Sequence, residues 1–174
     1  MKRGRLVTGA FVVVLLGIQF VPNDLPESRQ PNPGDIIQSG IVTSEVAEML
    51  KVSCYNCHSN ETVYPWYSFV APSSWLVAKD VRDGRDELNF SDWADYSMMD
   101  KLAKLDDLVS EVEEGKMPLG IYTLVHPSAK LDDAQRQSIV AWAEAAMDVV
   151  AEEEDEQEEE EEEQDDVEEE DSEQ

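Results

Sequence analysis

The segment Cys54-Tyr55-Asn56-Cys57-His58 decides how the rest of the sequence is interpreted. It contains the only two cysteines of the chain, and one of the only two histidines follows them directly. Residues three apart share one face of a helical turn, so both thiols can reach one flat molecule. Cys-x-x-Cys-His is the attachment pattern of c-type haem, in which thioethers hold the porphyrin and the histidine binds iron. We therefore predict one covalently bound haem c per chain.

Three other interpretations of this segment stay open, and one of them is a chance cluster of these residues. A redox dithiol would require a thioredoxin-like strand and helix around the cysteines, and no such pattern is found. A zinc site, in a zinc-stabilised interaction domain, would require two ligands beyond the cysteine pair. Only His58 and His126 are obvious candidates, and the adjacent Cys57 and His58 fit one tetrahedron poorly.

The composition describes one modest domain with a strongly charged end. The chain has 174 residues and a formal net charge of −27. Residues 152–173 hold 18 acidic residues and no basic one, which leaves 22 acidic against 13 basic residues in the rest. The overall charge argues against nucleic-acid binding.

The first 22 residues have the layout of an export or membrane segment. Lys2, Arg3 and Arg5 precede an apolar run that extends from Leu6 to about Val21. This arrangement predicts an uncleaved membrane anchor or a signal peptide in residues 1–22. We expect a bacterial inner-membrane protein whose domain faces the periplasm, or an exported protein after cleavage.

Three further segments follow the first. Residues 23–41 are rich in proline and glycine and predict an extended, poorly packed linker. Residues 42–150 predict an all-α domain. Residues 151–174 lack an apolar period and predict a disordered polyacidic tail, because like charges repel.

Four helices are expected within the domain, from caps and apolar spacing. The first begins near Thr43 and carries the cysteines at its end, on one apolar stripe. The others begin at Pro72 and Ser73, after Trp93, and at Asp132. Gly115 is expected to end the third helix as a C-terminal cap.

Met117 is the predicted second axial ligand of the iron. It lies in the short loop Gly115-Lys116-Met117-Pro118-Leu119-Gly120. A thioether opposite His58 would give a His/Met pair, which raises the reduction potential. His126 is the alternative ligand, and an open sixth site is a third possibility.

Three further residues are predicted to bind the cofactor. Trp66 and Tyr67 lie in an aromatic loop that could form a wall of the haem site. The Arg85 guanidinium could pair with a haem propionate, since it matches the fork of a carboxylate. We expect the carbonyl of Pro65 or Pro72 to accept a hydrogen bond from the His58 ring.

The pieces together resemble the small haem-binding domain family of exported bacterial proteins, which has a single Cys-x-x-Cys-His. The resemblance covers residues 42–147. The residues that carry it are Cys54 to Thr62, Pro65-Trp66-Tyr67, Ala71-Pro72, Ser74-Trp75-Leu76, Gly84-Arg85, Asn89-Phe90-Ser91, Trp93, Gly115, Met117-Pro118, Tyr122, His126-Pro127, Leu131 and Trp142. Leu119 departs from the family, which often has a second proline there. The resemblance implies a cytochrome c-like helical domain with covalent haem.

The function expected from these features is periplasmic electron transfer by a c-type monohaem protein, which would not be an enzyme. The acidic surface would favour redox partner proteins with basic patches. The alternative is a haem-based sensor or gas-binding module with an open sixth site. No catalytic triad, phosphate loop or pair of catalytic carboxylates stands out in the sequence.

Overall fold

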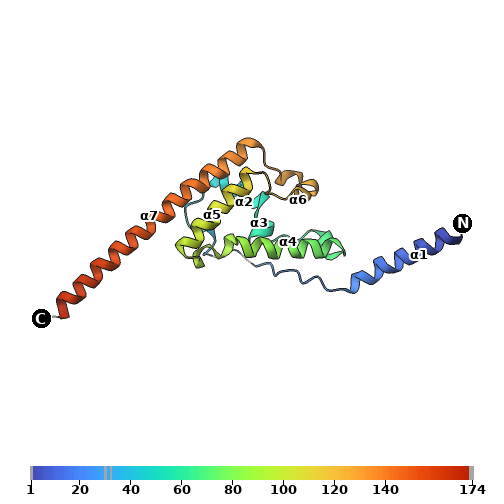
Figure 1. Ribbon diagram of the computed structural model, residues 1–174, viewed down its shortest axis with the longest axis horizontal. Helices are drawn as coiled ribbons and strands as arrows, with labels where there is room; N and C mark the ends of the chain where they lie inside the picture. The colour runs from blue at the N-terminus through green and yellow to red at the C-terminus, as the bar shows by residue number, and fades with distance from the viewer. Residues whose placement is uncertain (1, 30, 32, 173–174) are drawn as a thin grey trace.

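The computed structural model is helical in the residues it describes, which are 2–29, 31 and 33–172, with side chains for 7–29, 31 and 33–152. No strand occurs among them (Figure 1). The α-helices are α1 (Lys2–Gly17), α2 (Ser44–Ser53), α3 (Tyr55–His58), α4 (Ser73–Glu87), α5 (Met98–Glu113), α6 (Gly120–Val125) and α7 (Asp133–Ser172). The 3-10 helices are η1 (Ile18–Phe20), η2 (Ile36–Gln38), η3 (Trp66–Phe69), η4 (Phe90–Asp95) and η5 (Pro127–Ala129).

The core lies where α2, α5 and the first part of α7 meet. Figure 1 shows α5 and α7 side by side and antiparallel. Leu50, Leu105 and Ile139 bring one fully buried side chain from each of the three helices. Trp142 closes one edge, and its Nε1–H donates to the Ile41 carbonyl at 2.9 Å. Burying these apolar side chains provides the main driving force for folding.

Local hydrogen bonds start the helices where the sequence predicts. The Thr43 hydroxyl accepts from the backbone N–H of Val46 and caps α2. Asp132 and Gln135 form a reciprocal capping box before α7, with distances of 2.9 and 2.8 Å. Gly115 follows α5 with φ of +69°, the left-handed conformation that favours glycine at this position.

The apolar spacing predicted that the Cys-x-x-Cys-His segment would continue the first helix. The structure instead shows a break between them. Cys54 leaves the helical conformation with φ of −122°, and the short helix α3 begins after it. The backbone N–H groups of Cys57 and His58 both donate to the Cys54 carbonyl, at 3.0 and 2.9 Å. The motif therefore forms its own turn, set off from α2 by a break at the first cysteine.

Helix α4 packs against this turn at Gly84. A Cβ atom on Gly84 would lie 2.9 Å from the Cys57 carbonyl oxygen and 3.2 Å from the Cys57 Cβ. These are distances that real Cβ atoms scarcely show, and two of the atoms that a Cβ would meet belong to the backbone. Glycine is therefore required here for the close approach of α4 and α3.

The segment 23–41 packs on the domain, in contrast to the predicted free linker. Ile36 is fully buried in the core. Asp35 is buried beside it, where its carboxylate accepts hydrogen bonds from the hydroxyls of Tyr55 at 2.7 Å and Ser91 at 3.3 Å. One buried isoleucine and one buried carboxylate therefore hold the described part of this segment in place.

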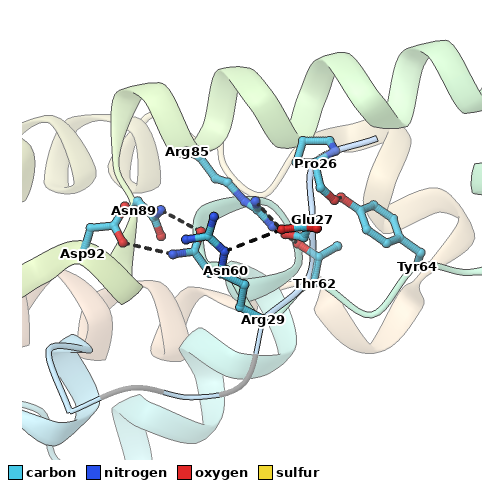
Figure 2. A network of polar contacts seen from close by, with 9 residues as sticks. All are labelled: Pro26, Glu27, Arg29, Asn60, Thr62, Tyr64, Arg85, Asn89 and Asp92. Atoms are coloured by element: carbon cyan, nitrogen blue, oxygen red, sulfur yellow. Dashed lines mark hydrogen bonds and ion pairs between the residues drawn. The ribbon is translucent and has the colours of Figure 1, made fainter. Parts of the chain in front are cut away.

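Arg85 fixes the same segment to the loop after the cysteine turn (Figure 2). Its guanidinium donates to the Ser59 carbonyl at 2.9 Å, the Thr62 hydroxyl at 3.0 Å and the Glu27 carbonyl at 3.0 Å. The backbone N–H of Arg29 donates to the Asn60 carbonyl in the same region. One cation therefore joins α4, the loop and the N-terminal segment.

The membrane anchor and the disordered tail are not confirmed. No helix in the described part of the chain is both long enough and apolar enough to cross a membrane. In place of a disordered tail, α7 continues as helix through Ser172, while residues 173–174 lie outside the described residues. Glutamate is a good helix former, and a helix already nucleated by packing propagates readily.

Gly84→Ala is expected to destabilise the protein by about 1–3 kcal/mol, because the added methyl group collides with the Cys57 backbone. Glycine to alanine within an exposed helix would instead stabilise by up to about 1 kcal/mol. Gly120→Ala is the matched control, since nothing lies within 4 Å of its Cβ position. Denaturant unfolding measures both variants. Equal free energies of unfolding for Gly84→Ala and Gly120→Ala would contradict the close approach of α4 and α3.

Arg85→Met is expected to lower the free energy of unfolding by about 2 kcal/mol or more, since it leaves three polar groups without their charged donor. Arg82→Met is the control on the same helix. Arg82 is exposed and donates to the Asp24 carbonyl, so its loss should cost less than about 1 kcal/mol. The midpoints of urea unfolding of the two variants are compared. A larger loss of stability in Arg82→Met would refute the clamp that the three Arg85 hydrogen bonds form.

Candidate cofactor site

A cavity of about 590 Å³ lies between α3, α4, α5 and the loop that follows α5. Its volume is within the range of protein sites for cofactors and small molecules. Leu88, Phe90, Leu108 and Val112 give it apolar walls, and Pro118, Leu119 and Tyr122 close one end. The cavity therefore suits a large, mainly apolar ligand.

Four of the predicted site residues line this cavity together. They are Cys54, Cys57, His58 and Met117. The first three come from the cysteine turn, and Met117 comes from a loop about sixty residues later in the chain. Two sulfurs that can be alkylated, one imidazole and one thioether thus share a single cavity.

The His58 ring is hydrogen-bonded through its Nδ1 atom to the end of α4. Its Nδ1 lies 3.0 Å from the Leu88 carbonyl oxygen, and a carbonyl can only accept, so Nδ1 carries the proton. Desolvation lowers the pKa of His58, although backbone hydrogen bonds near Leu88 and Gly84 partly oppose this. A neutral ring protonated on Nδ1 is the form in which Nε2 can bind a metal.

The partner of Nδ1 is therefore Leu88, and neither Pro65 nor Pro72 fills this role. Leu88 directly follows α4, so the hydrogen bond joins the end of that helix to the cysteine turn. The sequence predicted the kind of hydrogen bond correctly but chose the wrong carbonyl.

Both thiols are protonated at neutral pH. Desolvation, aided by the proximity of Cys57, raises the pKa of Cys54 to about 12. Desolvation and the Asp80 carboxylate raise the pKa of Cys57 to about 11, against the opposing effect of Arg85. A redox dithiol needs a lowered thiol pKa, so the surroundings of the motif do not suit that chemistry.

Backbone contacts hold Met117 at the cavity. The Met117 N–H donates to the Glu111 carbonyl at 3.1 Å, within the turn that closes α5. Arg136, on α7, donates through Nη1 to the carbonyls of Met117 at 3.2 Å and Val112 at 3.0 Å. These hydrogen bonds join the Met117 loop to α5 and to α7, and the Met117 thioether lies in the lining of the cavity.

His126 is placed differently from His58 and Met117. It does not line the cavity, and its Nε2 is hydrogen-bonded to the Tyr67 hydroxyl at 2.5 Å. Its ring stacks on Tyr122, with 4.5 Å between the ring centroids. The Tyr122 hydroxyl in turn accepts from Asn56 Nδ2 at 2.8 Å. His126 therefore supports the cavity wall from behind Tyr122.

Trp66, Tyr67 and Arg85 are also outside the cavity lining. Trp66 is 77% exposed on η3. The Arg85 guanidinium is used by the clamp shown in Figure 2. Trp66 and Tyr67 follow the motif closely, and Arg85 lies on the next long helix. These positions in the sequence do not indicate where the side chains point.

Charged residues of α4 and α5 form the polar part of the lining. The cations there are Lys79 and Lys104. Lys104 donates to the Glu87 carbonyl at 2.5 Å and lies 4.8 Å from the Tyr96 ring centroid. The carboxylates of the lining are Asp80, Asp83, Glu87, Asp107 and Glu111. Neither lysine was predicted from the sequence, because lysine spacing carries no signal for a cavity.

The donor set fits a c-type haem. Paired thiols, an imidazole with a defined tautomer and a thioether meet at one cavity with apolar walls. A zinc ion would require three or four donors at one point. Among the residues the structure describes, no three His, Cys, Asp or Glu side chains are grouped to hold a metal ion.

Comparison with protein families matches residues 13–145 to the family described as Haem-binding domain. The match includes the segment 23–41 that packs on the helices. No curated protein and no solved structure matched the chain. Because the family match covers more than half of the sequence, this protein belongs to the haem-binding domain family.

Proposed function

We propose that this haem-binding protein is a c-type monohaem electron-transfer protein. One haem would be attached through Cys54 and Cys57, with His58 and Met117 as axial ligands. The observation that carries this proposal is that all four side chains line one cavity. Bound haem iron would supply a one-electron couple, which no amino-acid side chain in the site provides.

The two thiols would form the attachment. Each thiol would add across one vinyl group of the haem, so that its S–H bond is replaced by a C–S bond to one vinyl carbon and a C–H bond on the other. The addition consumes no oxidant or reductant, but it needs both cysteines as thiols and not as a disulfide. The raised pKa values of Cys54 and Cys57 agree with protonated thiols before attachment.

His58 and Met117 would act as ligands that do not exchange protons near neutral pH. The Leu88 carbonyl holds the imidazole proton on Nδ1, which orients the ring and increases its basicity. The Met117 thioether has no proton to lose, and Arg136 fixes its loop. A His/Met pair favours a high reduction potential.

Lys79 and Lys104, and not Arg85, would be the cations nearest to the propionates, because they line the cavity. The five carboxylates of the lining outnumber them and give this face a negative potential. A redox partner with a basic patch would be steered towards such a face at low ionic strength. The protein itself would make or break no bonds in a substrate.

The proposed location of the domain is outside the bacterial cytoplasm. The N-terminal segment would be attached to the inner membrane or removed on export. Basic residues before an apolar run support this orientation. Covalent haem attachment of this kind is expected in an exported domain.

The protein matured in a host that attaches haem c should be coloured and should carry the mass of one haem after denaturation. Both properties should disappear in Cys54→Ser/Cys57→Ser, because no thioether can form. The control is the wild-type chain produced in a host without the attachment machinery. Absorption spectra and intact mass measure the result. A colourless wild-type product in both hosts would refute the proposal.

Met117→Ala should remove the weak absorption band at the red end of the oxidised spectrum, which reports sulfur ligation. The reduction potential should fall by on the order of 0.1 V, within the roughly 0.8 V that axial ligands span. The reduced variant should also bind carbon monoxide more readily than wild type. Met99→Ala is the control, since Met99 is 69% exposed and outside the cavity lining.

An unchanged spectrum in Met117→Ala would show that Met117 is not a ligand. Ready carbon monoxide binding by the wild type would favour the sensor with an open sixth site.

A further inference from the structure

A group of apolar side chains on η3 and α6 is exposed to solvent. We name it the η3 face and define it by Trp66, Phe69, Val70, Leu124 and Val125, with exposed fractions of 77, 65, 41, 77 and 57%. Side chains three apart in a 3-10 helix are eclipsed, so Trp66 and Phe69 point to the same side. The hydrogen bond between Tyr67 and His126 joins η3 to the end of α6. None of the five residues lines the cofactor cavity.

The end of the N-terminal helical segment is fastened to this same face. The Gln19 side chain forms two hydrogen bonds with Ala71, one from its Nε2 to the carbonyl and one from the Ala71 N–H, both at 3.0 Å. Asn23 Nδ2 donates to the Ser68 carbonyl at 3.1 Å. These contacts flank η3, so the chain that follows α1 joins the domain beside this 3-10 helix.

From Val7 onwards, α1 is mainly apolar, and its side chains are exposed. Val7, Phe11, Val13 and Leu16 of α1 and Phe20 of η1 are 70, 62, 69, 62 and 88% exposed. In water this much contiguous apolar surface is unfavourable, and surfaces of this kind mark contact with a partner or a membrane. A helix of 16 residues is about 24 Å long at 1.5 Å per residue. It can therefore extend through most of the roughly 30 Å hydrocarbon layer of a bilayer.

The distribution of charge indicates a lipid partner over a protein partner. Residues 1–23 contain Lys2, Arg3 and Arg5 and no acidic residue, whereas 18 acidic residues lie between 152 and 173. Figure 1 shows α1 and the end of α7 at opposite ends of the molecule. Anionic lipid would attract the first end and repel the second. Tryptophan and other aromatic residues favour the membrane interface, where an apolar ring meets polar headgroups.

We propose that the η3 face is a membrane-contact surface, and that the Gln19–Ala71 clamp holds it against the bilayer that α1 enters. The contact would give the domain one orientation, with the acidic end of α7 directed away from the lipid. This inference rests on the N-terminal membrane attachment in the proposed function. It does not depend on how the haem is ligated.

Hydroxyl-radical footprinting of the full-length holoprotein in nanodiscs tests the proposal. The nanodiscs contain phosphatidylcholine and phosphatidylglycerol and hold one chain each, which excludes a second copy as the cover. Trp66 and Met99 are both very reactive and are similarly exposed in the structure, at 77 and 69%. Their oxidation rates, each divided by the rate in the digested peptide, form an internal ratio. Without a contact this ratio should be near one, because the two side chains are similarly exposed. A bilayer contact should lower it at least about fivefold, because the bilayer excludes water from Trp66.

Gln19→Ala separates the clamp from the insertion of α1. This variant should raise Trp66 oxidation at least about threefold while Phe11 stays protected, because the domain can then leave the membrane surface. Gln38→Ala on η2 is the control and should change neither rate.

A Trp66:Met99 ratio near one overturns the proposal, and Phe11 shows how. If Phe11 is protected, α1 enters the bilayer and the η3 face does not contact it. If Phe11 is oxidised, the N-terminal attachment fails as well. Protected Trp66 that does not respond to Gln19→Ala would refute the role of the clamp. The Soret absorption of the same sample reports the haem independently of these outcomes.

Discussion

The contact between α3 and α4 is the constraint on which the rest of the site depends. At one point Gly84 allows the helix backbone to reach the Cys57 carbonyl. One turn later the Leu88 carbonyl accepts a hydrogen bond from His58 Nδ1–H. The first contact sets how near the helix lies. The second sets how the imidazole is rotated and leaves Nε2 as the nitrogen that would bind iron in the proposed holoprotein. A side chain at position 84 would disturb both.

The opposite wall of the cavity is built by other means. It comes from α5 and its C-terminal turn, which are fixed to α7 through Arg136. Protein interiors are usually packed without large voids, yet these helices leave about 590 Å³ between them. The lining combines apolar side chains with charged side chains from α4 and α5. A cofactor that belongs to the core explains why a domain of this size does not close on itself.

Much of the fold follows from local signals in the sequence. The capping box at Asp132 and the glycine at position 115 are short-range features, and the structure places helix ends at both. The break at Cys54 was not predictable from the apolar spacing, because it depends on how the cysteine turn packs against α4. The continuation of α7 as helix shows that glutamate-rich sequence allows helix as well as disorder.

Prediction of the site was less even. The sequence brought together His58 and Met117 because each has a distinctive chemistry and setting, and both line the cavity. Arg85 and Trp66 were selected for chemistry alone, and their side chains are directed to the N-terminal segment and to solvent. The acceptor for His58 is a backbone carbonyl, which any residue could supply. Only the packing of α4 identifies it as Leu88.

In the proposed holoprotein, the two walls of the cavity would differ in whether they can separate from the porphyrin. The cysteine turn would hold the porphyrin by bonds that survive unfolding, whereas Met117 would hold it by a coordinate bond and a loop clamp. If α5 and its loop detached, the ring would stay on the chain, so the domain could reopen and reclose without recruiting a new cofactor. Opening would then be reversible at the α5 wall, and the retained ring would give this wall a surface on which to pack again.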